Sequence, residues 1–215
     1  MSATGTRVAY ASSTSFDRIR PYAVVGICAA IAGVSIAMGL TAYGVSEEGW
    51  RTSVQYAGRA AIVIFLLPFL AGPLARLFRV PGLLIDRRAY GLGFAFAYAA
   101  YLATVIAPYV LGGYRIPPTV VLFTAVGVAM LAVQVLTSNS LSIRTLGFAA
   151  WSRIHRFVMY AYWTIFTLGL LDQYVSPHRP DQFLALGLTL MIAALLIRFA
   201  AAFAEKIGFA KTIRP

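Results

Sequence analysis

The chain has 215 residues, of which 60% are hydrophobic and 12% charged, and its formal net charge is +11. Soluble domains contain about 45 to 50% apolar residues, so this composition excludes an ordinary soluble protein and predicts a membrane protein. A nucleic-acid binder gathers its basic residues on a soluble face, whereas here they lie in short links between apolar stretches. Cys28 is the only cysteine, which excludes a disulfide or a cysteine metal site within one chain.

Six apolar stretches have about the length of 20 residues that a helix needs to cross a bilayer. The sequence therefore predicts an all-α, polytopic membrane protein with a bundle of six transmembrane helices over residues 22–203. We expect a polar N-terminal tail at 1–21, with no cleavable signal peptide, and a C-terminal tail at 204–215. In chain order, the predicted spans are 22–43, 57–78, 91–111, 119–136, 154–171 and 183–203.

Three features of the spans carry expectations about packing. Pro68 and Pro73 lie inside the second span, where we expect them to kink the helix. The small-residue runs GICAAIAGVSIAMG in the first span and FAAAFA in the last predict close helix approach. Gln134 and the segment 137–139 are polar and predict hydrogen bonds between helices.

Lysine and arginine accumulate in the cytoplasmic links of membrane proteins, so their distribution predicts orientation. One side of the predicted bundle has few of them, and the rest lie on the side that contains both tails. We therefore expect both termini in the cytoplasm. The basic residues on the cytoplasmic side are Arg7, Arg18, Arg20, Arg76, Arg79, Arg87, Arg88, Arg144, Arg153, Arg156, Arg198, Lys206, Lys211 and Arg214, and those on the opposite side are Arg51, Arg59, Arg115 and Arg179.

Arg59 lies inside the start of the second span, on the side where positive charge is scarce. An ionisable residue within a span is costly and often functional. The alternative is that Arg59 extends to the headgroups or pairs with Glu47 or Glu48, and we favour this interpretation. All aspartates and glutamates lie in links or tails, so the sequence predicts no proton relay across the membrane.

Two sequence blocks resemble the ferric-reductase-like transmembrane family, and within it the haem-binding membrane subunit of the bacterial periplasmic methionine-sulfoxide reductase system. The first block, AGRAAIVIFLLPFLAGPLARLFRVPGLLIDRRAYGLGFAFAYAAYL, contains the Gly-Arg entry, the Pro-Leu-x-Arg exit and the Arg-Arg-x-x-Gly-Leu opening of the third helix. The second, LAVQVLTSNSLSIRTLGFAAWSRIHRFVMY, contains Thr-Ser, Leu-Gly and Trp-x-x-x-His-Arg. The resemblance covers about residues 55 to 171 and implies a location in the bacterial cytoplasmic membrane.

The resemblance also implies haem b held by histidine pairs between the third and fifth helices, and this chain departs from that pattern. The third-helix histidine is expected where the chain has Tyr101, and the second fifth-helix histidine where it has Leu168. The motif histidine of the fifth helix is present as His155. The other histidine, His178, lies in the opposite link, a bilayer thickness away at about 1.5 Å per helical residue. The outer bis-histidine site is therefore lost, and Tyr101 or Met159 stays conceivable as a haem ligand.

His155 is also the centre of a predicted cytoplasmic basic cluster. Arg153 and Arg156 flank it, and the topology brings Arg87 and Arg88 close to it. Such a cluster can hold an anion, such as a haem propionate, a flavin phosphate, a quinone oxygen or an anionic lipid. The other interpretation is positive-inside anchoring, with a histidine that hydrogen-bonds a neighbour, and we favour it. One haem b near His155, with His155 as the metal ligand, stays open, as does a bound lipid, quinone or pigment.

Three functions remain. The one we favour is an integral-membrane accessory or structural subunit of a larger complex, with other membrane proteins and lipids as its partners and no catalysis of its own. The alternative is a one-haem or flavin-assisted subunit that moves electrons from a cytoplasmic donor or quinol to a periplasmic partner. A small-solute transporter has the least support, because no charged or broken-helix site is predicted at mid-depth.

Overall fold

The computed structural model describes residues 15–80, 82–112, 115–175 and 182–207. Every element in these ranges is an α-helix, which confirms the predicted all-α class for the described residues. Most of the predicted tail at 1–21, the end of the tail at 204–215 and His178 lie outside them. The helices are α1 (Ser15–Tyr43), α2 (Glu47–Phe78), α3 (Gly82–Ile85), α4 (Arg87–Gly112), α5 (Pro118–Leu136), α6 (Ser140–Leu146), α7 (Phe148–Val175) and α8 (Gln182–Lys206).

Five helices in the described ranges are long and apolar enough to cross a membrane, namely α1, α2, α4, α5 and α8. Helix α7, which contains the predicted span 154–171, is not one of them. Its length is sufficient, but its share of tyrosine, tryptophan and threonine, together with Arg153 and Arg156, lowers its hydropathy. The chain is therefore a multi-pass membrane protein, and the sixth span stays a prediction.

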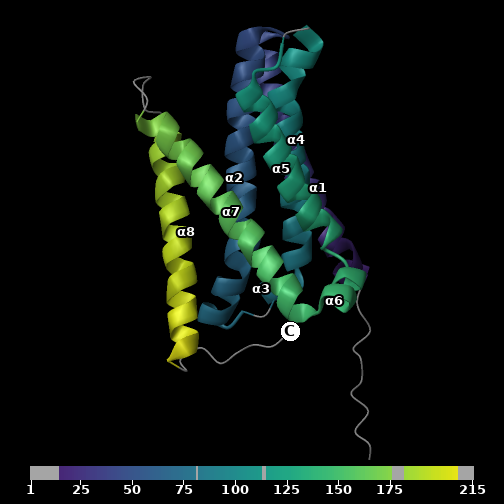
Figure 1. Cartoon of the computed structure of the whole chain (residues 1–215), viewed down its shortest axis with the longest axis vertical. Helices are drawn as coiled ribbons and strands as arrows, with labels where there is room; N and C mark the ends of the chain where they lie inside the picture. The colour runs from purple at the N-terminus through teal and green to yellow at the C-terminus, as the bar shows by residue number, and fades with distance from the viewer. Residues whose placement is uncertain (1–14, 81, 113–114, 176–181, 208–215) are drawn as a thin grey trace, which may run out of the picture.

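The long helices alternate in direction along the chain (Figure 1). Helix α1 begins and α8 ends at the same end of the bundle, the lower end in the figure, which we call the near end. Helices α1, α2 and α4 pack closely together, α5 packs mainly on α4, and α8 contacts both α2 and α7. Helix α7 crosses the view obliquely from α6 at the near end to the start of α8 at the far end. The side of the membrane on which the near end lies stays a prediction.

Small residues bring α1 close to its neighbours, as the first glycine-rich run predicts. A Cβ atom on Gly39 would collide with the backbone nitrogen and the hydroxyl of Ser53 in α2, so no side chain fits there. The Ser53 hydroxyl donates to the carbonyl of Ile36 at 2.8 Å, so the contact is polar as well as close. Buried Cys28 packs in the same way against Gly93 of α4.

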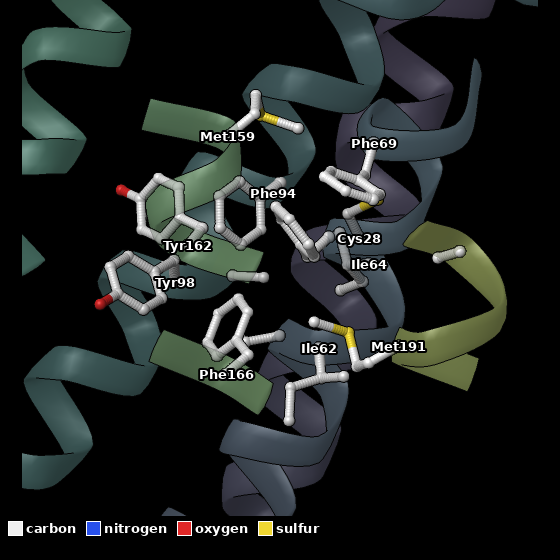
Figure 2. Packing of buried hydrophobic residues seen from close by; sticks show 14 of the residues in the cluster. Cys28, Ile62, Ile64, Phe69, Phe94, Tyr98, Met159, Tyr162, Phe166 and Met191 are labelled. Carbon is white, nitrogen blue, oxygen red and sulfur yellow. The ribbon is translucent and has the colours of Figure 1, made fainter. Parts of the chain in front are cut away.

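Aromatic rings fill the centre of the bundle where α2, α4 and α7 meet (Figure 2). Neighbouring rings lie 4.9 to 6.2 Å apart between centroids, and most pairs are tilted or edge-to-face. These are the geometries that aromatic quadrupoles favour. We call this group the aromatic core, and its members are Phe65, Phe69, Phe94, Tyr98, Tyr162 and Phe166.

Helix α2 continues through both prolines as a single helix. Because Pro73 has no N–H, the carbonyl of Phe69 four residues earlier loses its helical hydrogen-bond partner. Arg198 of α8 supplies one, since its Nη1 donates to that carbonyl at 3.0 Å. The Arg198 guanidinium also lies 4.3 Å from the centroid of the Phe69 ring and 4.8 Å from that of Tyr160. Arg198 therefore ties α8 to the point where the backbone of α2 is interrupted.

We expect Arg198→Met to lower the free energy of unfolding by roughly 1 to 3 kcal/mol, because a buried carbonyl is left without a donor. In a Pro73→Ala background the loss should be smaller, since the substituted alanine restores the helical N–H. Reversible unfolding in mixed detergent micelles measures both values. Pro68→Ala is the control background. It restores an N–H elsewhere in α2 and leaves the Phe69 carbonyl dependent on Arg198. Equal losses in all three backgrounds would show that Arg198 does not serve the Phe69 carbonyl.

Candidate functional site

The two positions where the resemblance implies lost haem ligands do not face each other. The Tyr101 ring packs over Gly58 of α2, where an added Cβ would lie 3.3 Å from Tyr101 Cε2. Leu168 is 58% exposed and lies on the outer surface of α7, whereas Phe166 and Leu170 on the same helix are buried in the core. Ligands at 101 and 168 would therefore point to different environments in this arrangement of helices.

A cavity of about 890 Å³ lies at the far end, between α2, α4, α5, α7 and α8. Tyr101 lines it. Apolar side chains from deeper turns, among them Ile62, Phe166 and Leu170, form part of its wall. Polar side chains come from the helix ends, and these are Glu47, Arg51, Gln55, Arg59 and Gln173. Among the described residues that line it there is no histidine, cysteine or methionine, so Tyr101 has no partner of the usual kind for haem iron.

Arg59 contributes to this cavity and contacts aromatic rings. Its guanidinium carbon lies 4.8 Å from the ring centroid of Phe183 and 5.7 Å from that of Tyr56, both within the range of a cation–π contact. Sequence reasoning expected the headgroups or Glu47 and Glu48 as partners and gave no signal for Phe183, which comes from a distant helix. The two rings hold the charge of Arg59 beside the cavity.

His155 is held by a hydrogen bond and a ring contact at the near end. Its Nε2 lies 2.8 Å from the hydroxyl oxygen of Thr137, the residue that caps the end of α5. The centroid of its ring lies 4.4 Å from that of Trp151, with the two rings tilted by 38°, and the Trp151 indole nitrogen donates to the Thr137 carbonyl at 2.7 Å. This confirms that His155 bonds a neighbouring side chain, and that Thr137 in the segment 137–139 joins two helices. Gln134 of α5 also joins α5 to α7, since its Nε2 lies 3.8 Å from the sulfur of Met159.

The residues present do not fit an axially ligated haem. The Nε2 of His155 and the sulfur of Met159 already have partners, so binding iron would break the contacts that hold α7 to α5. Within the described ranges no group of three or more histidine, cysteine, aspartate or glutamate side chains could hold a metal ion. The centre of the bundle between α4 and α7 is occupied by the aromatic core.

The predicted basic cluster is only partly assembled. Arg87 lies within electrostatic reach of His155 and Arg156. Arg87, Arg88, Arg153 and Arg156 are all exposed, and Arg153 donates to the Ala149 carbonyl of its own helix at 3.4 Å. Two arginines that the prediction left out, Arg76 and Arg198, act on Arg87 instead. The sequence could have indicated Arg76 and Arg198, because both lie on the same predicted side of the membrane as Arg87.

Four uncharged side chains have buried polar atoms without a hydrogen-bond partner in the described part of the chain. Two of these atoms are the hydroxyls of Tyr98 and Tyr162, which belong to the aromatic core and are fully buried. Figure 2 shows both hydroxyls pointing the same way, out of the core. The other two are Thr124 Oγ1 and Gln134 Oε1 on the buried side of α5. Sequence reasoning identified only Gln134.

No protein-family model matches the sequence, and no solved structure matches the chain. The fold itself defines the class of protein as a helical, multi-pass membrane protein.

We expect Tyr162→Phe and Tyr98→Phe each to raise the free energy of unfolding by roughly 1 kcal/mol, since a buried hydroxyl without a partner is unfavourable. Thr137→Val is the control, because it removes a hydroxyl that contacts His155 and should lower the free energy of unfolding by a similar amount. Unfolding in mixed micelles measures all three variants. A loss of stability in Tyr162→Phe and Tyr98→Phe would mean that a bound water or ligand completes their hydrogen bonding.

Proposed function

We propose that this chain is an integral-membrane accessory subunit of a larger complex. It is built on a ferric-reductase-like helix bundle that has lost its outer bis-histidine haem site. The observation that carries the proposal is the aromatic core, which fills the space between α2, α4 and α7 with packed rings. The placements of Tyr101 against Gly58 and of Leu168 on the outer surface support it.

In this proposal α7 is the sixth span and both tails are in the cytoplasm of a bacterium. With 28 residues at about 1.5 Å each, α7 is longer than the hydrocarbon core of about 30 Å. Its polar residues lie where neighbours can satisfy them, as Trp163 shows by donating to the Met191 carbonyl of α8 at 2.8 Å. A span with internal partners tolerates a lower hydropathy.

The partner of an accessory subunit needs a surface, and α5 offers one. Its large apolar side chains are mostly exposed, and its buried residues are Thr124, Gly127 and Gln134. Beside α7 this helix borders an apolar groove of about 460 Å³, where the small Ala129 leaves room for a close approach. We place the partner's transmembrane helix in this groove, which is lined by Ala129, Met130, Val133, Arg153, Ile154, Phe157 and Val158.

The test is purification from native membranes in a mild detergent. The chain should copurify with the same membrane proteins in repeated preparations. We expect Ala129→Phe to reduce this recovery by roughly tenfold, because the loss of one helix contact weakens binding by about 1.4 kcal/mol. Leu122→Phe, on the exposed surface of the same helix but outside the groove, should leave recovery unchanged. A chain that always purifies alone would contradict the proposal.

An absorption spectrum of the same material, with a pyridine haemochrome assay, separates this proposal from the electron-transfer alternative. We expect neither a Soret band nor flavin absorbance, since two of the candidate iron ligands, His155 and Met159, already have partners. A stoichiometric Soret band would establish the one-haem alternative. If Tyr101→Phe then removed that band, Tyr101 would be its ligand.

A further inference from the structure

Four arginines from four different helices converge at the near end of the bundle. They are Arg76 in the last turn of α2, Arg87 at the start of α4, Arg156 in α7 and Arg198 in α8. Arg87 is within electrostatic reach of the other three, and Arg198 is within reach of Arg76 and Arg156. We call this group the arginine cluster. It links the α2–α4 side of the bundle to the α7–α8 side.

Among the described residues, two carboxylates are placed beside the four arginines of the cluster. Glu205 Oε2 accepts from Arg76 Nη1 at 3.0 Å, and Asp86 is buried at the head of α4. Against four arginines, these two described carboxylates leave two positive charges unbalanced. Like charges held together at a low-dielectric boundary repel each other unless an anion joins them. The cluster is therefore short of negative charge by an amount that a phosphate group can supply.

A buried donor in the same cluster also lacks a partner. Arg76 Nε is buried and has no hydrogen-bond acceptor in the described part of the chain, although Nη1 of the same side chain binds Glu205. Arg198 bonds the Phe69 carbonyl and lies over the ring of Tyr160, and a guanidinium with five N–H groups can make further bonds. A buried N–H without an acceptor indicates a group that belongs there when the protein is in its membrane.

We propose that the arginine cluster binds one phosphate ester group, that of an anionic phospholipid in the leaflet at the near end. Guanidinium groups bind phosphate oxygens in a bidentate way, and basic pockets between transmembrane helices recognise anionic headgroups. Arg76 lies in the last turn of α2 and Arg87 is the first residue of α4, so these two members of the cluster lie at helix ends, where headgroups are expected.

Exposed phenylalanines beside the cluster favour a lipid over a soluble phosphate. Phe78 follows Arg76 by two residues, and Phe199 follows Arg198 directly. Both rings are exposed on the outer surface of their helices. A phospholipid whose phosphate lies among the arginines places its acyl chains along this apolar surface. A free phosphate ion would make no use of it.

The bound phosphate acts as a link between helices. It joins Arg76 and Arg87 to Arg156 and Arg198, and so supplements the two existing bonds between α2 and α8. Anionic lipid is therefore expected to stabilise the packing of α7 and α8 on the rest of the bundle.

The test compares Arg156→Gln and Arg87→Gln with Arg153→Gln and Arg88→Gln. All four side chains are exposed, and each pair removes the same charge from the same two helices, but the first pair, unlike the second, lies within electrostatic reach of Arg198. In nanodiscs of phosphatidylcholine with increasing phosphatidylglycerol, native mass spectrometry counts the retained lipids and thermal unfolding reports their effect. We expect the preference for phosphatidylglycerol to fall roughly fivefold for each cluster arginine removed. The two control variants should match the unsubstituted chain.

Circular dichroism shows whether each variant is folded, and Arg156→Lys, which retains the charge without the bidentate geometry, should recover part of the preference. Inorganic phosphate in discs of phosphatidylcholine alone forms the second arm. If it stabilises the unsubstituted chain but not Arg156→Gln, the site is confirmed with a soluble phosphate as its occupant. Equal losses in Arg156→Gln and Arg153→Gln would overturn the proposal, because general attraction to the membrane would then suffice. The proposal would also be overturned if the unsubstituted chain showed no preference for phosphatidylglycerol.

Discussion

The packing of aromatic rings between α2, α4 and α7 is the interaction on which the rest of the structure depends. Each of the three helices contributes two rings to it, and the Tyr98 and Tyr162 rings, from α4 and α7, lie 4.9 Å apart. In lipid, helix association cannot rely on the removal of apolar surface from water, so close van der Waals contact must hold the helices together. The aromatic core supplies that contact where α7 meets α2 and α4.

A second constraint is that backbone groups inside a bilayer need partners within the protein. Pro73 frees the carbonyl of Phe69, and Arg198 supplies the missing donor from a helix 129 residues away in sequence. The Phe69 ring belongs to the aromatic core and also lies beneath the Arg198 guanidinium. Phe69 therefore accepts the hydrogen bond from Arg198, packs in the aromatic core and lies beside a positive charge. The hydrogen bond explains how α2 remains continuous past Pro73.

The sequence predicted the helices well and the interactions between them poorly. For α4 and α8 the apolar runs 91–111 and 183–203 lie within a few residues of the helix ends, because charge or proline marks their limits. Helix α2 is longer than its predicted span because Ser46, whose side chain accepts from the Gly49 N–H, caps it beyond the apolar run. The short helices α3 and α6 carry no periodic signal. Among the interhelical contacts, Arg198 with Phe69 depends on the rotation of two distant helices, and composition does not contain that information.

The basic residues of the near end divide by geometry into two kinds, although the positive-inside rule treats them alike. Arg87, Arg88, Arg153 and Arg156 are exposed, whereas Arg76 and Arg198 reach inward to a carboxylate and a carbonyl from other helices. On the proposed relationship to the ferric-reductase-like bundles, this chain has given up a porphyrin. Its side chains must then fill the space that the porphyrin occupied. A vacant space of that size would forfeit the dispersion contacts of every side chain around it. On that relationship, the rings of the aromatic core make those contacts between α2, α4 and α7, and inward-facing arginines that no longer meet a propionate are free to hold another anion.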